Sequence, residues 1–422
     1  MTKCRRPEIV TYGCRLNTFE SEIIRKQAET AGLVETVIFN TCAVTAEAER
    51  EALSQIKKLK RDQPNLSIIV SGCAAQIDPE KFKNMAEVDL VLGNEEKLEL
   101  ESYLLSNLKE KIIISDIMTV KEIAGHLISG FKSRSRAFIQ VQQGCNHRCT
   151  FCVIPFARGN SRSVPIEHII KQINDIVDNG YREVVLTGVD ITSYGNDLIG
   201  KPSLGQMIRH LLISVPNLER LRLSSLDPAA IDRDLLELFA NEPRLMPHVH
   251  LSVQAGSDII LKRMKRRHTR KNVIELCNQM RESRANIVFG ADLITGFPTE
   301  TEELFDETMQ LVDEADLTYL HVFPYSPRPK TPAVRMPQID AKTIKYRSTA
   351  LRKKGLQKKD EYFHSLKGKI TSILVESKNR GYTETFAPVS LINEQKKGEI
   401  ISALITSTSP DGLTAEQAPS VN

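Results

Sequence analysis

The sequence predicts an α/β chain in three parts: a doubly wound parallel sheet domain, a partial (β/α) barrel and a small antiparallel β-barrel. Strand-like and helix-like segments alternate over residues 3–115, which indicates a parallel sheet covered by helices. The alternation repeats over residues 137–335 in six further units, which is typical of a barrel or partial barrel. Residues 366–408 instead contain short alternating strands with turns at Arg380-Gly381 and Lys397-Gly398, as in a small barrel.

In the first part we expect strands over 8–12, 37–40, 66–71 and 88–92, with helices over 20–31 and 45–60. In the second part we expect strands over 138–142, 183–187, 220–224, 248–253, 287–291 and 319–323. Each of these six runs directly into polar or glycine-rich residues. Because the chemistry of such folds lies at the carboxyl ends of the strands, we expect the site there.

A chain of 422 residues is too long for one ordinary core, so we expect several domains. The expected ranges are 1–118 for the sheet domain, 119–136 for a linker, 137–340 for the partial barrel, 341–363 for a basic helical connector and 364–422 for the small barrel. The tail from Ser407 onward is expected to be frayed.

Composition is that of a soluble globular protein, with 41% apolar and 26% charged residues. No run approaches the ~18 apolar residues of a membrane span, and the N-terminus has no apolar stretch that resembles a secretory signal. Eight cysteines in such a chain suit a reducing compartment. These features predict a cytoplasmic protein with no membrane partner.

Positive charge is concentrated in two places although the net charge is only +4. Between Lys342 and Arg380 there are twelve basic and three acidic residues, a local excess of nine positive charges. A second basic run extends from Lys262 to Lys271. Either run alone is more often a solvated helix face, but two of them favour a polyanionic partner.

The most informative motif is the spacing C-x3-C-x2-C at Cys145, Cys149 and Cys152. Three thiols within eight residues leave one unpaired, so a disulfide framework does not explain them. Cysteine thiolates hold iron–sulfur clusters, and three of them leave one iron of a four-iron cluster open for another ligand. The alternative is a structural zinc site, whose local fourth ligand would have to be His147.

A second set of cysteines follows three predicted strands of the first domain, at Cys14, Cys42 and Cys73. Because the carboxyl ends of neighbouring parallel strands meet in one crevice, these thiols can converge despite their wide separation in sequence. We therefore expect a second three-thiolate cluster, and the alternative is three unrelated buried thiols. Cys4 and Cys277 match no cluster motif and are expected to be structural or incidental.

Together these residues resemble the methylthiotransferases of the radical S-adenosylmethionine (SAM) class. The resemblance extends over nearly the whole chain and includes the three phrases Tyr12-Gly-Cys-Arg-Leu-Asn, Asn40-Thr-Cys-Ala-Val-Thr and Ser71-Gly-Cys-Ala-Ala-Gln. It continues through Ile154-Pro-Phe-Ala-Arg-Gly159 after the cysteine loop and ends in a TRAM-like barrel, a module associated with RNA. It implies two 4Fe-4S clusters, SAM as cofactor and substrate, and an electron donor such as flavodoxin or ferredoxin.

The residues of these motifs most resemble those of the tRNA enzymes that act on N6-threonylcarbamoyladenosine at position 37. Asn40-Thr-Cys-Ala-Val-Thr-Ala-Glu-Ala-Glu49, Val185-Leu-Thr-Gly-Val-Asp-Ile-Thr-Ser-Tyr-Gly195 and Tyr325-Ser-Pro-Arg-Pro-Lys-Thr-Pro-Ala333 carry this likeness. The isopentenyladenosine branch and the branch that modifies a ribosomal-protein aspartate usually have different phrases at the dispersed cysteines. Both stay open as alternatives, and a zinc-containing RNA-binding protein is the alternative that is not an enzyme.

The resemblance also implies roles for individual residues. Cys145, Cys149 and Cys152 would hold the cluster that cleaves SAM, and Cys14, Cys42 and Cys73 the cluster at which sulfur is methylated. SAM would contact positions around the barrel mouth, namely Phe151, Thr187, Gly188, Ser252, Gln254, Asp292 and Gly296. The anticodon loop of tRNA would be bound by the small barrel and by basic residues of the connector, namely Arg352, Lys353, Lys354, Lys358 and Lys359.

Overall fold

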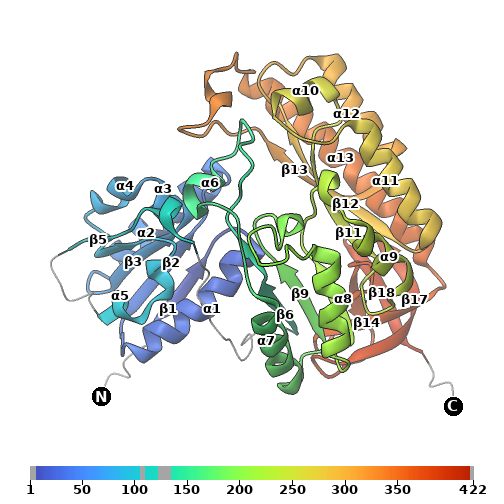
Figure 1. Ribbon diagram of the computed structural model, residues 1–422, viewed down its shortest axis with the longest axis horizontal. Helices are drawn as coiled ribbons and strands as arrows, with labels where there is room; N and C mark the ends of the chain where they lie inside the picture. The colour runs from blue at the N-terminus through green and yellow to red at the C-terminus, as the bar shows by residue number, and fades with distance from the viewer. Residues whose placement is uncertain (1–5, 105–109, 122–134, 419–422) are drawn as a thin grey trace.

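The structure, a computed structural model, describes residues 6–104, 110–121 and 135–418 (Figure 1). The sheet domain, the partial barrel and the C-terminal barrel follow one another along the chain, as predicted. Cys4 lies outside the described residues. Within the described residues, no helix combines the length and the apolar character needed to cross a membrane.

The N-terminal domain is a sheet of five parallel strands in sequential order: β1 (Glu8–Thr11), β2 (Thr36–Thr41), β3 (Ser67–Gly72), β4 (Leu90–Leu92) and β5 (Ile112–Ile113). Helices α1 (Arg15–Thr30) and α5 (Leu100–Leu104) pack on one face, and α2 (Ala46–Asp62), α3 (Cys73–Ile77) and α4 (Pro79–Lys83) on the other. Helices therefore cover both faces, as predicted. The short strand β5 was not predicted, because a strand of two residues carries no periodic signal.

Helix α1 begins at Arg15, five residues before its predicted start at Glu20. Its residues Leu16 and Phe19 are buried in the same core as the barrel strands, while Ala28 packs on the N-terminal sheet. A helix that is buried on two sides lacks a simple one-sided apolar stripe. The apolar pattern therefore predicted a start that lies too far along the chain. The helix joins the two domains through a shared core.

The partial barrel consists of two three-stranded parallel sheets, ordered β10-β9-β6 and β11-β12-β13. Their bounds are β6 (Arg136–Gln140), β9 (Glu183–Thr187), β10 (Arg220–Leu223), β11 (His248–Gln254), β12 (Val288–Thr295) and β13 (Leu317–Pro324). Two single bridges, Leu221 to Leu245 and Leu226 to Leu251, connect the sheets. The outer helices are α7 (Ile166–Asp178), α8 (Leu204–Ser214), α9 (Arg233–Asn241), α11 (Arg270–Ser283) and α12 (Glu302–Glu314). All six predicted strands are present.

The amino ends of the barrel strands are closed by the C-terminal barrel. Glu183, at the start of β9, accepts a hydrogen bond from Arg222 Nε at 2.9 Å, and Arg136 Nε donates to Glu376 of the C-terminal barrel at 2.8 Å. Arg222 also donates to the carbonyl of Glu384 at 3.0 Å. These buried ion pairs close the lower end, so a ligand must enter at the carboxyl ends of the strands or from the side that faces the N-terminal domain.

The C-terminal barrel is closed by five strands: β14 (Ile370–Ser377), β15 (Arg380–Thr383), β16 (Pro388–Leu391), β17 (Ile400–Ser409) and β18 (Gly412–Gln417). The predicted fraying from Ser407 was wrong, because Leu413 and Ala415 of β18 alternate into the core. One pairing, β16 with β18, is parallel, and the others are antiparallel. The connector helix α13 (Ala341–Leu366) is three residues longer than the predicted connector.

Candidate active site

The local cysteine loop lies between β7 (Gln142–Gln143) and α6 (Ile154–Arg158). Its backbone folds back on itself, with Cys145 N bonded to Gly159 O at 3.1 Å and Cys152 N to Cys149 O at 3.0 Å. Burial raises the pKa of Cys145 to about 12 and that of Cys152 to about 11, and repulsion between the neighbouring thiolates adds to both shifts. The structure therefore brings the three predicted thiols together.

The guanidinium of Arg266 contacts this loop. Arg266 donates to Cys149 Sγ at 3.7 Å and to the carbonyl of Ser252 at 2.7 Å, and its guanidinium lies 3.3 Å from Asp227. The Arg266 side chain is only 8% exposed although it belongs to the basic run from Lys262 to Lys271. One member of that run is therefore part of the site, not of a solvated face.

The dispersed cysteines also meet. Cys14 caps the start of α1, Cys42 follows β2, and Cys73 begins α3 after β3. Burial raises the pKa of Cys42 to about 12, and the nearby Cys73 and Cys14 raise it further. At Gly13, whose φ is +93°, an added Cβ would lie 2.7 Å from Cys42 Sγ, so no larger residue fits there. The strand ends converge as the parallel topology requires.

A buried arginine links this second set to the barrel. Arg158, the last residue of α6, donates to Cys73 Sγ at 3.2 Å, to Gln143 Oε1 at 2.8 Å and to Asn17 Oδ1 at 2.6 Å. Its charge is balanced by Glu20, whose Oε1 accepts from Nη1 at 2.7 Å. Lys97 donates to the same carboxylate at 2.6 Å, and the Lys97 and Glu20 side chains are fully buried.

Between the two sets lies a cavity of about 220 Å³. Val44 and Thr45, which follow Cys42, form one wall, and Tyr325 and Ser326 contribute to another. Among the predicted SAM-binding residues, the cavity is lined by Phe151, Gln254 and Asp292. Gln254 has a φ of +75°, which is uncommon for a residue other than glycine and is typical of functional sites.

The other predicted SAM contacts do not line this cavity. Thr187 is buried at the end of β9, and a Cβ at Gly188 would lie 2.7 Å from the carbonyl of Gln142. Ser252 offers its carbonyl to Arg266. A Cβ at Gly296 would lie 2.5 Å from Ile344 of α13, so this glycine permits helix packing. His147, the possible zinc ligand, lies 3.0 Å from Asp190 Oδ2 instead.

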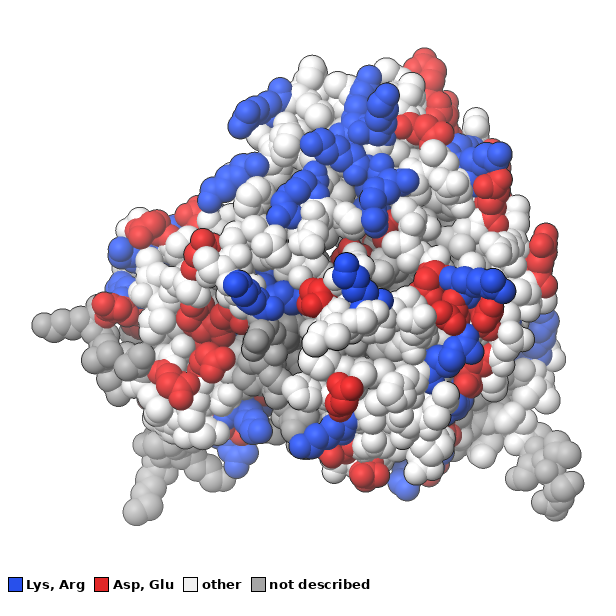
Figure 2. All heavy atoms as spheres, viewed as in Figure 1, with Lys and Arg blue, Asp and Glu red and all other residues white. Residues whose placement is uncertain are grey.

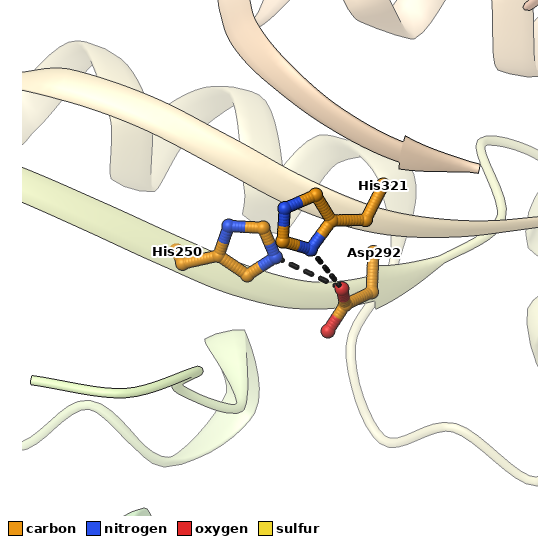
Figure 3. Close-up of side chains that lie close together, drawn as sticks. All are labelled: His250, Asp292 and His321. Atoms are coloured by element: carbon orange, nitrogen blue, oxygen red, sulfur yellow. Dashed lines mark hydrogen bonds and ion pairs between the residues drawn. The ribbon is translucent and has the colours of Figure 1, made fainter. Parts of the chain in front are cut away.

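Asp292 is held by two histidines that the sequence alone did not single out (Figure 3). Its Oδ1 lies 2.9 Å from His250 Nε2 and 3.2 Å from His321 Nδ1, and the three residues come from β11, β12 and β13. Although burial favours the neutral carboxyl, His250 and His321 hold the pKa of Asp292 well below its usual range. Two neighbouring hydrogen bonds thus fix an ionised carboxylate at the edge of the cavity.

The basic residues predicted to bind RNA on α13 are largely engaged within the protein. Lys354 lies 2.7 Å from Asp313, Lys358 lies 2.6 Å from Asp316, and Arg352 donates to the carbonyl of Val322 at 3.1 Å. Lys359 lies over the ring of Phe363. Of these five cations, only Lys353 has no such partner among the described residues. Their role in RNA binding stays a prediction.

Both cysteine sets fit a 4Fe-4S cluster. Each offers three thiols, the donor that such clusters take, and each has an arginine hydrogen-bonded to one of its sulfurs. His147, the imidazole that could complete a four-ligand zinc set at the local loop, is instead held by Asp190. Cys277 lies in the barrel core on α11, away from both sets, in agreement with its expected structural role.

Comparison with known proteins agrees with this arrangement. Residues 139–312 match the radical SAM superfamily model, and residues 6–93 match that of the uncharacterized protein family UPF0004. Among solved structures, the radical SAM methyltransferase TsrM from Kitasatospora setae, with cobalamin and a 4Fe-4S cluster bound, aligns with a TM-score of 0.57. The alignment covers 78% of this chain and 77% of that chain at 15% identity, so it shows the fold alone.

Sequence relatives identify the family more narrowly than the fold does. The threonylcarbamoyladenosine tRNA methylthiotransferase MtaB of Rickettsia prowazekii is 53% identical over 398 residues, 94% of each chain, and that of Thermotoga maritima is 33% identical over 98% of this chain and 97% of its own. The tRNA-2-methylthio-N(6)-dimethylallyladenosine synthase of Ehrlichia canis is 34% identical over 88% of each chain. The chain therefore belongs to the radical SAM tRNA methylthiotransferase family.

Proposed function

We propose that this protein replaces the C2 hydrogen of N6-threonylcarbamoyladenosine at position 37 of tRNA with a methylthio group. The observation that carries the proposal is the 53% identity with the Rickettsia threonylcarbamoyladenosine enzyme over 94% of both chains. The dimethylallyladenosine enzyme of Ehrlichia canis reaches only 34%. Identity of this kind favours the threonylcarbamoyl substrate over the isopentenyl one and over a ribosomal-protein aspartate.

The cofactors are SAM and two 4Fe-4S clusters, which when bound supply reductive cleavage of SAM and the sulfur that is methylated and transferred. Cys145, Cys149 and Cys152 are proposed to hold the cluster that binds SAM. The other cluster is assigned to Cys14, Cys42 and Cys73. Convergence of each set of thiols, with an arginine on one sulfur, supports the assignment.

The protein itself orients the reactants and excludes water. Val44 and Thr45 of the N-terminal domain and Phe151 of the barrel form opposite parts of one cavity, so a base seated there lies between the two cysteine sets. Gln254 and Asp292 supply polar groups in that cavity, and SAM is proposed to contact them together with Phe151. Thr187, Gly188 and Ser252 stay predictions as SAM contacts.

Bonds between the two domains lie beside the cavity. The hydroxyl of Ser326 accepts from Ala46 N at 3.3 Å, and Arg328 lies 3.1 Å from Glu49 Oε2. A nucleotide must be unstacked from its loop to enter a cavity between two domains, as bases of single-stranded RNA loops commonly are. tRNA is therefore the proposed macromolecular partner, and a small electron-transfer protein such as flavodoxin or ferredoxin the proposed reductant.

The domain limits at residues 118, 136, 340 and 363 are kept as a proposal. The bounds of the described elements are compatible with it, because β6 starts at Arg136 and α13 at Ala341. The core shared by α1 and the barrel nevertheless makes the first two parts one packed body.

Nucleoside analysis of tRNA from cells that lack this protein tests the function. Loss of the methylthio derivative of threonylcarbamoyladenosine, with accumulation of its unmodified precursor, is the expected result. Loss of the methylthio derivative of isopentenyladenosine would instead move the protein to the other tRNA branch. Unchanged tRNA would contradict both. Purified protein that binds zinc and has no iron–sulfur absorbance would favour the non-enzymatic alternative.

A further inference from the structure

Arg15 is a cation that makes no hydrogen bond or ion pair with another described residue. It is the first residue of α1, directly after Cys14, and it is only partly exposed. Within the part of the chain that the structure describes, no carboxylate, carbonyl or hydroxyl accepts a hydrogen bond from its guanidinium. The guanidinium instead faces the ring of Phe386, whose centroid lies 5.8 Å from Cζ. An enclosed guanidinium that no carboxylate contacts directly is costly unless an anion joins it.

The arginines around Arg15 do not share this situation. Arg136 and Arg222 are its cationic neighbours, and both act on it by charge repulsion. Arg136 is neutralised by Glu376 at 2.8 Å, and Arg222 by Glu183 at 2.9 Å. The acids of this region are thus already committed, and Arg15 has five donor hydrogens available for a ligand.

Arg15 also lies between the N-terminal domain and the inside of the partial barrel. It adjoins Cys14 on the N-terminal side, and on the barrel side it is attracted by Asp292, which lines the cavity. His248 is within the electrostatic reach of both Arg15 and His321, so the exposed His321 belongs to the same neighbourhood. The guanidinium is therefore within electrostatic reach of the cavity, on the side that faces the C-terminal barrel.

We propose that Arg15 binds the carboxylate of the threonyl group on the target nucleotide. This inference rests on the proposed function. In threonylcarbamoyladenosine the amino acid is attached through its amino group, so its carboxylate stays free. A guanidinium binds a carboxylate through two parallel hydrogen bonds, a geometry that lysine cannot reproduce. An isopentenyl group offers no such anion, and the unpaired Arg15 would oppose its burial.

The test compares methylthiolation of one tRNA in two forms, with the threonyl carboxylate free or converted to its amide. Wild-type enzyme is expected to prefer the acid by about 10- to 100-fold in kcat/KM, the range of a charge-assisted hydrogen bond. Arg15→Gln should lose most of this preference, and Arg15→Lys should keep part of it. Arg25→Gln, on the same helix but 3.5 Å from Glu22, is the matched control and should behave as wild type.

An Arg15→Gln enzyme that still prefers the acid as strongly as wild type would overturn the proposal. If Arg15→Gln fails to load iron, the wild-type comparison of acid and amide decides alone, and equal rates would refute carboxylate recognition. Failure of the proposed function gives a different result, because the wild-type enzyme would then modify neither form. SAM cleavage without tRNA should be unchanged in Arg15→Gln.

A second proposal concerns the surface around the cysteine loop, where hydrogen bonds hold three segments together. Thr150 N bonds to Met264 O at 3.1 Å, and Thr150 Oγ1 donates to Arg263 O at 2.8 Å. The Thr150 carbonyl accepts from Ala333 N at 2.9 Å. One residue thus holds the cysteine loop, the end of α10 (Asp258–Arg263) and the loop after β13 side by side.

Exposed cations project from all three segments. We call the following six residues the basic rim: Arg148, Lys262, Arg263, Lys265, Lys330 and Arg335. Among the described residues none of the six pairs with a carboxylate; Arg148 and Arg263 bond only to carbonyl, amide or hydroxyl oxygens. Figure 2 shows Lys and Arg side chains gathered at the top of the visible face, over α10 and the neighbouring loops.

The basic rim contrasts with helix α13, where the sequence predicted RNA contacts. Lys354 and Lys358 of α13 are neutralised by Asp313 and Asp316. Phosphate binding is mostly electrostatic, so unpaired cations bind RNA more strongly than paired ones. We infer that the basic rim binds the backbone phosphates on either side of the target nucleotide, which places the anticodon loop over the cavity mouth.

Titration of tRNA affinity against salt separates the two surfaces. Each phosphate that a variant no longer neutralises should reduce the slope of log affinity against log salt by about 0.7–0.9. The quadruple variant Lys262→Ala, Lys265→Ala, Lys330→Ala and Arg335→Ala should therefore flatten the slope by roughly three units. The matched variant of α13, with Lys353, Lys354, Lys358 and Lys359 changed to Ala, should flatten it less. SAM cleavage without tRNA should be unchanged in both.

An unchanged slope in the rim variant, or a stronger flattening in the α13 variant, would overturn the assignment and return the RNA surface to the connector. Phosphate contacts position RNA without specifying its sequence, so the rim variant should weaken binding of unrelated hairpins equally.

Discussion

The two cysteine sites bring their thiols together in different ways. At the barrel loop, Cys145, Cys149 and Cys152 lie within eight residues and need only one folded-back turn. In the N-terminal domain, Cys14, Cys42 and Cys73 come from three strand ends and meet only when the whole sheet is formed. The first site is a local property of the sequence, and the second is a property of the fold. The second should therefore be the more sensitive to distant changes.

The arginine at the barrel loop is held within its own domain, whereas the arginine at the N-terminal site depends on contacts between domains. Arg266 reaches Cys149 from within the barrel and shares Asp227 with Arg267 and His268. Arg158 reaches Cys73 from the other domain and is balanced by Glu20, whose one further partner among the described residues is Lys97. A packing error between the domains would thus disturb the N-terminal site first.

The largest expected effect separates the two sites completely. Changing Cys145, Cys149 and Cys152 to Ala should abolish SAM cleavage and leave about half of the iron, because each site holds one four-iron cluster. Changing Cys14, Cys42 and Cys73 to Ala should also leave half of the iron but should preserve SAM cleavage. Iron analysis and product detection after anaerobic reconstitution measure both. Loss of all the iron in either variant would show that the sites are interdependent.

The next effect compares the two arginines. Arg158→Ala leaves the buried Glu20 with a single partner, and breaking such a pair costs about 3–5 kcal/mol. Arg266→Ala leaves Asp227 with Arg267 and His268, so we expect a loss of about 1–3 kcal/mol. Urea denaturation of the metal-free proteins gives both values. Equal losses would contradict the greater dependence of the N-terminal site on contacts between domains.

A smaller effect is expected at two glycines of the N-terminal domain. Gly13 and Gly32 both have positive φ, +93° and +72°, so alanine at either position costs about 1–2 kcal/mol in backbone strain. Only Gly13 lies against a site thiol, since nothing surrounds an added Cβ at Gly32 within 4 Å. Gly13→Ala should therefore lose iron, up to half of the total, while Gly32→Ala keeps it. Full iron content in Gly13→Ala would refute the tight packing around Cys42.

The last effect is on pH dependence. Although burial favours the neutral form, Arg158 and Lys97 lower the pKa of Glu20 to about 2. Since the carboxyl titrates near 4.3 when unfolded, its contribution, on the order of 3 kcal/mol, is present above about pH 4 and is lost as the pH falls towards 2. Unfolding free energy measured between pH 5 and pH 2 should fall less steeply in Glu20→Gln. The surface variant Glu22→Gln is the control and should follow wild type.

The strand pattern and the cysteine spacing were readable from the sequence because both are short-range. All six barrel strands and the sheet cysteines follow from periodicity and from the parallel topology. The closing strand β18 was missed because its alternation of Leu413 and Ala415 is brief and lies in a polar tail.

The arginines that contact the thiols could not be found in the same way. Arg158 meets Glu20 across 138 residues, and Arg266 meets Cys149 across 117, distances over which no periodic pattern extends. Arg266 also stands in a basic run, where a solvated side chain is the ordinary expectation. The only local signal for Arg158 was its place in Ile154-Pro-Phe-Ala-Arg-Gly159, directly after the cysteine loop.

The assignment of SAM cleavage to the barrel site and of methylthio transfer to the N-terminal site is tested most directly with the Cys42→Ala enzyme. After anaerobic reconstitution it is supplied with SAM, a reductant and tRNA that carries threonylcarbamoyladenosine, and the nucleosides and SAM products are analysed by mass spectrometry. We predict that SAM is still cleaved to 5′-deoxyadenosine while no methylthio nucleoside forms. Full methylthiolation by the Cys42→Ala enzyme would contradict the assignment of methylthio transfer to the N-terminal site.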